Sequence, residues 1–178
     1  MGNALEKVKV LQIYDIQSMV KELEALLSLI GEEQQREVME RGDPGQVEIN
    51  HKPNLIVVDS IGSLLSPMLG GQGYDAGQSM LVATAMYLKG LAEQLGVAVV
   101  VTNYTVSGEQ QVHGVGEYVV KKAALGGAWA GQAHARLYLL RPRKDALEMS
   151  QEERQTRKAY LSSSTMGPSG TCVTFSIY

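Results

Sequence analysis

The sequence contains little that would tie it to a membrane or to an oxidising compartment. Cys172 is the single cysteine among 178 residues, so no disulfide can form within the chain, which fits the reducing cytosol or nucleus. No apolar run approaches the roughly 20 residues of a transmembrane helix, and the first ten residues lack the apolar core of a secretory signal. Met1-Gly2-Asn3 opens like a myristoylation site, but the sixth residue is Glu6 rather than serine or threonine. We therefore expect no membrane attachment.

Metal ligands are also scarce. His51, His113 and His134 are far apart and lack the spacing of a ligand set, so the sequence predicts no metal site. Cys172 lies in an apolar segment and is predicted to be part of the core. Hydrophobic residues make up 44% of the chain and charged residues 20%, which indicates a folded globular domain rather than a disordered chain.

The charges divide unevenly along the chain. Residues 1–120 carry seven Lys/Arg and fifteen Asp/Glu, a net charge of −8, whereas residues 121–178 carry nine and four, a net charge of +5. A basic end of this kind is typical of a surface that faces a polyanion or a partner. Chance clustering on a solvated surface explains it equally well, and both explanations stay open at this point.

Apolar periodicity predicts a strand and a helix in the first part of the chain. Residues 8–13 alternate between apolar and polar side chains, which predicts a strand. Asp15 stands where a helix cap belongs, and an apolar stripe at helical spacing continues to Ile30, so we expect a helix that ends at Gly31. Residues 32–53 are charged and contain Gly and Pro, which predicts a surface insertion with a short helix before Gly42.

Two continuous apolar runs follow, at residues 55–58 and 97–102, and each predicts a strand buried on both faces of a parallel sheet. The segment between them predicts a loop over residues 66–78 and a helix over 79–95. Residues 104–127 contain five glycines without a regular period and predict a long, mobile loop.

Three short apolar segments at residues 135–140, 159–164 and 173–177 predict strands without intervening helices. The order of elements therefore predicts an α/β domain with a mainly parallel sheet and a C-terminal antiparallel extension.

Polar residues stand where the two parallel strands end. Asp59 and Ser60 follow the first run, and Thr102 and Asn103 close the second. Ligands of open α/β sheets bind at these carboxyl ends. Four apolar residues followed by an acid also have the form of a Walker B element, in which a strand fixes a carboxylate near a phosphate-bound Mg²⁺. An aspartate that merely caps a helix or a turn is the alternative.

Three segments carry a resemblance to a known family. LIVVDSIGSLLSPMLGGQG, LKGLAEQLGVAVVVTN and ALGGAWAGQAHARLYLL resemble, in order and spacing, core elements of the RecA-type recombinases. DSIGSLLSPMLGG, VVVTNY and KKAALGGAW are most similar to the D-type paralogs of the eukaryotic strand-exchange recombinase, and the similarity runs from about Val8 onward. The resemblance implies a RecA-like P-loop NTPase core, with ATP and Mg²⁺ as the family's cofactors and Asp59 and Ser60 as the Walker B residues.

The family's phosphate loop, G-x-x-x-x-G-K-[ST], does not occur in the 178 residues. The glycines of residues 70–79 and 167–171 come without the lysine, so we interpret both segments as turns. We therefore expect residues 1–178 to form a single, partial RecA-like core domain, with the N-terminal domain and the P-loop segment absent. For this chain we expect no catalytic residue, no bound cofactor and no enzyme activity. A DNA-dependent ATPase is the alternative, if a full-length chain supplies the P-loop.

Active family members continue the second strand into Thr-Asn-Gln, where the glutamine senses the γ-phosphate. Here Asn103 and Tyr104 occupy the sensor position, and tyrosine cannot replace the amide. This loss suits a paralog that assists rather than catalyses.

Residues 104–127 correspond to a DNA-binding loop of the family. The resemblance makes Lys121 and Lys122 candidate phosphate contacts, and Arg136 matches a family arginine. Two acidic residues in the loop, Glu109 and Glu117, favour the alternative of a solvated loop without DNA, and Arg136 fits a structural ion pair equally well.

The sequence thus predicts an accessory recombinase paralog that acts in repair of DNA double-strand breaks by homologous recombination. Its expected partners are other recombinase paralogs, with single-stranded DNA as a further candidate and no membrane. Its expected location is the nucleus. A free-standing DNA-binding module would need a more basic loop.

Overall fold

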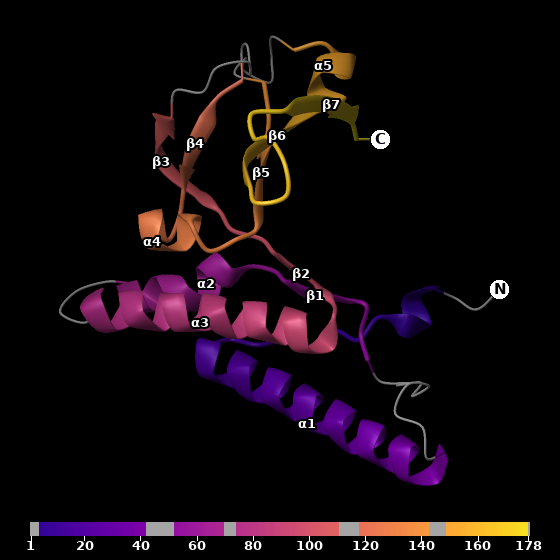
Figure 1. The fold of residues 1–178 in the computed structure, drawn as a ribbon. Helices are drawn as coiled ribbons and strands as arrows, with labels where there is room; N and C mark the ends of the chain where they lie inside the picture. The colour runs from indigo at the N-terminus through magenta and orange to yellow at the C-terminus, as the bar shows by residue number, and fades with distance from the viewer. Residues whose placement is uncertain (1–3, 42–51, 70–73, 111–117, 143–148, 178) are drawn as a thin grey trace. The chain divides into compact units, whose positions relative to one another are not determined.

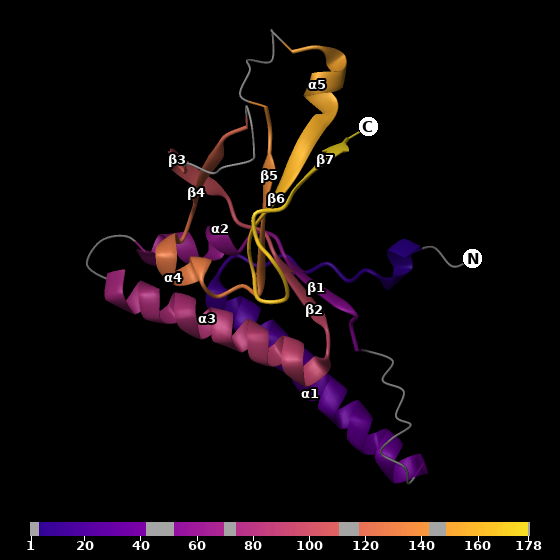
Figure 2. The same cartoon turned by 45° about the horizontal axis from the view of Figure 1, so that its top comes forward.

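Helices and short strands alternate along the chain, so the α/β class is confirmed (Figures 1 and 2). The computed structural model describes residues 4–41, 52–69, 74–110, 118–142 and 149–177. The chain separates into two compact units, residues 1–77 with 87–102 and residues 78–86 with 103–178. The prediction of one domain over residues 1–178 stays a prediction.

Helix α1 (Ile16–Arg41) is the longest element of the first unit. Asp15 precedes it, and its Oδ1 accepts a hydrogen bond of 2.8 Å from the backbone N–H of Ser18 while Oδ2 accepts one of 2.7 Å from the Ser18 hydroxyl. Side chains at helical spacing turn inward and are buried, namely Ile16, Met19, Leu23 and Ile30. The start of the helix is therefore confirmed, with Asp15 as its cap.

Two predictions in this part of the chain are wrong. The helix does not end at Gly31 but continues to Arg41, because one glycine costs a helix only about 1 kcal/mol and the residues that follow favour helix. Residues 8–13 form no strand in the described chain, where a 3₁₀ turn, η1 (Ala4–Lys7), is followed by irregular backbone. The side chains of Val8 and Val10 are exposed, so their alternation does not mark a buried face.

Acid should weaken the start of α1. The backbone and side-chain bonds from Ser18 hold the pKa of Asp15 below its usual 3.8. A carboxyl group whose pKa is lowered by folding stabilises the folded state at pH values above its usual pKa. This stabilisation is lost as the pH falls through the lowered pKa. We expect Asp15→Asn to lose less helix than the unsubstituted chain between about pH 5 and about pH 2, measured by circular dichroism. Glu22→Gln, on the exposed side of α1, is the control. Equal acid losses in all three proteins would contradict the capping role.

Strands β1 (Leu55–Val58) and β2 (Ala98–Val101) pair in parallel, with Leu55 opposite Ala98 and Val57 opposite Val100. Both strands and their parallel pairing are confirmed. The prediction that both faces are buried is wrong, because Leu55, Val57 and Val100 are exposed on one face of this two-stranded sheet. Among the described strands no other pair is parallel, so a mainly parallel sheet is not confirmed.

A short helix follows β1, and the predicted loop over residues 66–78 contains a 3₁₀ turn and the start of the next helix. Helix α2 (Ile61–Leu65) and the 3₁₀ turn η3 (Ser66–Leu69) lead toward α3 (Tyr74–Leu95). Ile61 and Leu65 have no exposed surface, so α2 is part of the core rather than a connection. The C-terminal half of α3 lies alongside α1 in both views of the ribbon (Figures 1 and 2). No helix in the described residues has the length and apolar character needed to cross a membrane.

The second unit contains an antiparallel hairpin and a three-stranded antiparallel sheet. Its strands are β3 (Thr105–Gln110), β4 (Val120–Ala123), β5 (Ala135–Leu140), β6 (Thr156–Ser164) and β7 (Cys172–Ser176), and its short helices are α4 (Gly126–Ala130) and α5 (Gln151–Gln155). The hairpin corrects the prediction of a long loop at residues 104–127, although His113 and Glu117 lie outside the described residues. The C-terminal strands are antiparallel as predicted, but they form a sheet of their own rather than an extension of β1 and β2.

The core of the second unit lies between its two sheets. Val120 of β4 packs with Tyr138 and Leu140 of β5, and all three are buried. Four partly buried residues pack against this cluster, namely Tyr118, Ala123, Tyr160 and Cys172. The prediction that Cys172 belongs to a core is therefore confirmed.

Candidate functional site

Asp59 stands at the carboxyl end of β1, beside the end of β2. The Thr102 hydroxyl donates a hydrogen bond of 2.5 Å to Asp59 Oδ1. Two backbone bonds hold the same ends together, from Thr102 N–H to Val58 C=O at 3.0 Å and from Ile61 N–H to Thr102 C=O at 3.0 Å. The side chain of Asp59 is exposed, and its peptide bond to Ser60 is cis. The carboxylate is therefore fixed by a partner from the neighbouring strand and still faces solvent.

Ser60 caps the helix that follows. Its Oγ accepts a hydrogen bond from the backbone N–H of Ser63 at 3.4 Å and donates to Ser63 Oγ at 3.1 Å. The sequence left open whether Asp59 caps a helix, and in the structure the cap of α2 is Ser60 instead. Thr102 as the partner of Asp59 was missed, and its only signal in the sequence was its place at the end of an apolar run.

Asn103 and Tyr104 belong to the second unit, where they form the base of the β3–β4 hairpin. The Asn103 side-chain amide donates to Ala124 C=O at 2.9 Å, and Ala124 N–H donates to Tyr104 C=O at 2.9 Å. The aromatic ring of Tyr104 is exposed. Asn103 therefore has a structural role here, and the sensor role of both residues stays a prediction.

Lys121 and Lys122 are exposed on β4. The register places Lys122 opposite Val106 and Lys121 opposite Glu109, with a bulge between Val106 and Glu109. Gly108, in this bulge, has φ of 110°, a conformation that favours glycine. Because successive residues of a strand point to opposite faces, the two lysines present their charges on opposite faces of the hairpin.

Arg136 lies within β5, and it is half-buried. Its Nε donates to Ser162 Oγ at 2.9 Å, Ser162 Oγ donates back to Arg136 C=O at 3.2 Å, and its guanidinium lies 5.9 Å from the centre of the Tyr138 ring. A cavity of about 330 Å³ beside it is lined by His134, Ser163, Ser164 and Thr165, among others. These local bonds support a structural role for Arg136, and its contact with DNA stays a prediction.

Residues 8–150 match the sequence profile of the Rad51 family, which is most of the chain. The chain belongs to the Rad51 family. This membership confirms the resemblance to RecA-type recombinases and implies a RecA-like α/β fold.

Three relatives of this Rad51-family chain are DNA repair proteins by name. It is 34% identical to "DNA repair protein RAD51 homolog 4" of Mus musculus over 103 residues, which are 58% of this chain and 27% of that protein. It is 29% identical to the Bos taurus protein of the same name over 138 residues, 78% of this chain and 36% of that protein. "Probable DNA repair protein RAD51 homolog 4" of Dictyostelium discoideum is 29% identical over 114 residues, 64% of this chain and 28% of that protein. The chain thus matches little more than a third of these relatives at most.

The cofactors that the Rad51 family implies can be tested against the residues around Asp59. Mg²⁺ in such sites is held by one or two carboxylates, several waters and the phosphates of a nucleotide. Asp59 brings one carboxylate, with the Thr102 hydroxyl beside it, and the described part of the chain contains no group of three or more His, Cys, Asp or Glu side chains placed to hold a metal. Asp59 and Thr102 fit the few ligands that a protein supplies to an Mg²⁺ ion bound mainly by a nucleotide. They do not fit a site that holds a metal ion without a nucleotide.

Two substitutions at Asp59 should separate its hydrogen bond from its charge. Asp59→Asn can keep an acceptor for the Thr102 hydroxyl, so we expect the free energy of unfolding to change by less than about 0.5 kcal/mol. Asp59→Ala removes the acceptor and should cost about 1 kcal/mol, as should Thr102→Val. Urea unfolding measures these losses. The double variant Asp59→Ala with Thr102→Val should cost no more than either single variant, since both substitutions remove the same hydrogen bond. Additive losses would contradict the coupling.

Proposed function

We propose that this Rad51-family chain is an accessory subunit in the repair of DNA double-strand breaks by homologous recombination, working in the nucleus through other recombinase paralogs. The observation that carries the proposal is the alignment with relatives named as DNA repair proteins, which reaches 78% of this chain. The sequence Thr102-Asn103-Tyr104 supports an assisting role, because tyrosine stands where catalysing members place a glutamine.

Binding of paralogs is tested directly by co-expression. The 178-residue chain, carrying a tag, is expressed with each candidate recombinase paralog in turn, and complexes are isolated and sized. We expect a stable complex with at least one paralog at one-to-one stoichiometry. If every paralog is expressed and folded and none is retained, the proposed role as a paralog subunit is wrong.

The β3–β4 hairpin is the proposed contact with single-stranded DNA. Lys121 and Lys122 are both exposed on β4, and Tyr104 at the base of the hairpin presents an exposed ring. Lysines bind phosphates without regard to sequence, and an aromatic ring can stack on a base. Only one lysine lies on each face of the hairpin, so we propose weak binding that depends strongly on salt.

Removal of both lysines should weaken this binding in a defined way. Each phosphate contact that is lost lowers the slope of log affinity against log salt by about 0.7 for a single strand. We expect Lys121→Ala with Lys122→Ala to reduce this slope by about 1.4 if both lysines touch phosphates, and by about 0.7 if one face is used. Fluorescence anisotropy with a labelled oligonucleotide over a salt series measures the slope.

The control must remove the same charge elsewhere. Lys9→Ala with Lys21→Ala also deletes two exposed lysines, but from the first unit. We expect this control to leave the slope unchanged. If the two double variants behave alike, binding follows net charge and the hairpin is not the contact.

A further inference from the structure

Strand β7 forms an open edge of the C-terminal sheet. Among the strands of the described residues, the order β5-β6-β7 gives β7 a neighbour on one side only, and Figure 2 shows β7 running along the outside of β6. Proteins protect such edges with charged side chains, proline or bulges, because unpaired strands recruit other strands. Within Cys172–Ser176 there is no charged residue, no proline and no register shift against β6.

The unpaired backbone groups of β7 can be assigned from its bonds to β6. Thr171 C=O accepts from Leu161 N–H at 2.9 Å, and Ile177 N–H donates to Gln155 C=O at 3.0 Å. The backbone groups of Thr171 and Ile177 thus face β6, and because strands alternate, those of Val173 and Phe175 face β6 as well. The residues between them, which are Cys172, Thr174 and Ser176, direct their N–H and C=O groups away from the sheet.

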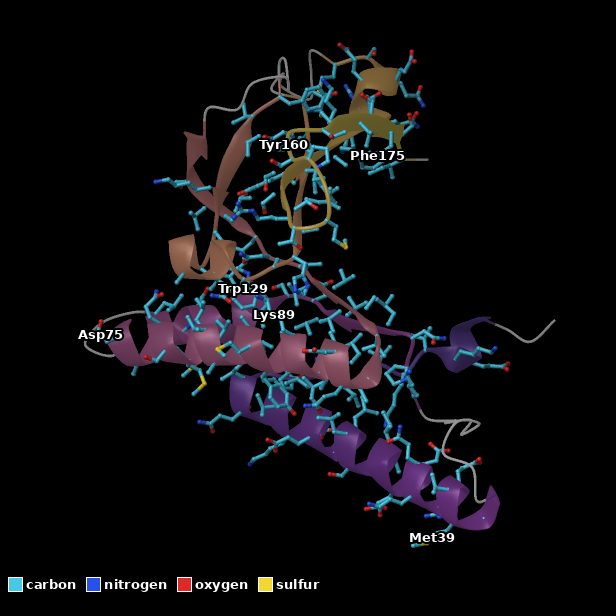
Figure 3. The ribbon with its side chains drawn as sticks, in the orientation of Figure 1. Met39, Asp75, Lys89, Trp129, Tyr160 and Phe175 are labelled. Atoms are coloured by element: carbon cyan, nitrogen blue, oxygen red, sulfur yellow. The ribbon has the colours of Figure 1, made fainter. Side chains whose placement is uncertain are left out.

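The side chains along this edge favour another strand rather than water. Val173 is 56% exposed and Phe175 is 37% exposed, and Figure 3 labels Phe175 on β7. The register places Leu139, Ala159 and Val173 side by side on one face of the sheet. β7 itself contains no Asp, Glu, Lys or Arg, and the nearest basic side chains, Arg157 and Lys158, lie one strand inward on β6. Two copies of this edge therefore place no like charges directly opposite one another.

Strand β7 can pair with β7 of a second copy in an antiparallel arrangement centred on Thr174. In an antiparallel pair centred there, Thr174 meets Thr174 of the second copy, Cys172 meets Ser176, and Val173 meets Phe175. The outward groups of Cys172, Thr174 and Ser176 are then in hydrogen-bonded positions, where they form about six backbone bonds. Val173 and Phe175 fall in the closer, non-hydrogen-bonded positions, where a β-branched side chain opposite an aromatic one is favourable.

We infer that two copies of this chain associate through β7, in an antiparallel pair centred on Thr174 that joins two three-stranded sheets into one. The neutral, self-complementary edge fits a second copy of the same strand. The interface is independent of DNA and of the paralogs proposed as partners, so its test stands apart from theirs.

Opposite charges at Thr174 test the symmetry of this pair. Thr174→Lys and Thr174→Glu each place two like charges opposite one another at the centre of the dimer. In sedimentation velocity we expect the unsubstituted chain to be a dimer, each variant alone to be a monomer, and an equimolar mixture of the two variants to regain the dimer. Recovery in the mixture requires that Thr174 of one copy faces Thr174 of the other.

Proline provides a second test that does not depend on charge. The N–H of Thr174 points outward, so Thr174→Pro removes a donor from the dimer while the bonds to β6 are kept. We expect this variant to be a folded monomer by circular dichroism, and Thr174→Ala, which keeps the N–H, to remain a dimer. The inference is overturned if the unsubstituted chain is monomeric, if association of any size survives Thr174→Pro, or if the mixture of folded charge variants stays monomeric.

Discussion

Leu140→Ala is expected to lower the free energy of unfolding of the second unit by about 2–5 kcal/mol. Leu140 is 3% exposed and packs with Val120 and Tyr138 in the cluster between the hairpin and the C-terminal sheet. Alanine there removes buried apolar surface and leaves a cavity that β4 and β5 cannot close without losing their register. A loss of this size is a large part of the 5–15 kcal/mol typical of a whole domain.

The adjacent residue provides a matched control. Leu139 lies on the same strand and carries the same side chain, but it points to the other face of the sheet and is 73% exposed. Leu139→Ala should therefore change the free energy of unfolding by less than about 1 kcal/mol. Urea unfolding followed by the near-ultraviolet signal of the tyrosines measures both variants. Similar losses for the two variants would mean that the cluster is not the core of this unit.

Asn103→Ala is expected to cost about 1–3 kcal/mol, and the loss should be concentrated in the β3–β4 hairpin. The Asn103 amide is partly buried and donates to Ala124 C=O, so alanine leaves that carbonyl without its donor. The bond joins Asn103, two residues before β3, to the residue after β4, so its removal opens the hairpin at its base. Hydrogen exchange of the backbone amides of both strands should become faster.

A different asparagine shows whether the effect belongs to this position. Asn54 lies just before β1 in the first unit and its side chain is exposed. Asn54→Ala should leave amide exchange in β3 and β4 unchanged. The structural role of Asn103 would be refuted if its replacement left the hairpin protected, or if both variants increased exchange equally.

The apolar runs of the sequence predicted most of the strands. Contacts and costs at particular residues explain the elements that were not predicted. The runs at Leu55–Val58 and Ala135–Leu140 form strands with the expected bounds, because short apolar runs of this length favour strand over helix. Helix α1 continues past Gly31 because the cost of one glycine is small against the favourable residues around it. The hairpin at residues 105–123 went unpredicted because the glycines that suggested a loop include Gly108, which serves a bulge within the ladder.

Part of the candidate site was also predicted from the sequence, and part was not. Asp59 was placed correctly at the end of a strand, since the apolar run that precedes it is unmistakable. Its partner Thr102 is 43 residues away in the sequence, and only the register of β1 against β2 brings the two together. Arg136 shows the same limit, because its bond to Ser162 arises from the register of β5 and β6, which a single sequence does not reveal.

The parallel pairing of β1 and β2 has a consequence for the order in which the chain folds. Pairing over 43 residues requires the closure of a long loop, whose entropy must be lost before any bond between the strands forms. The antiparallel pairs of the second unit join segments that are closer in sequence, so their loops close at a smaller entropic cost. On a ribosome β2 emerges long after β1, and until then the backbone groups of β1 that pair with β2 have no partner strand. The slow step of folding should therefore be the arrival of β2 beside β1, while the C-terminal sheet assembles as soon as it is released.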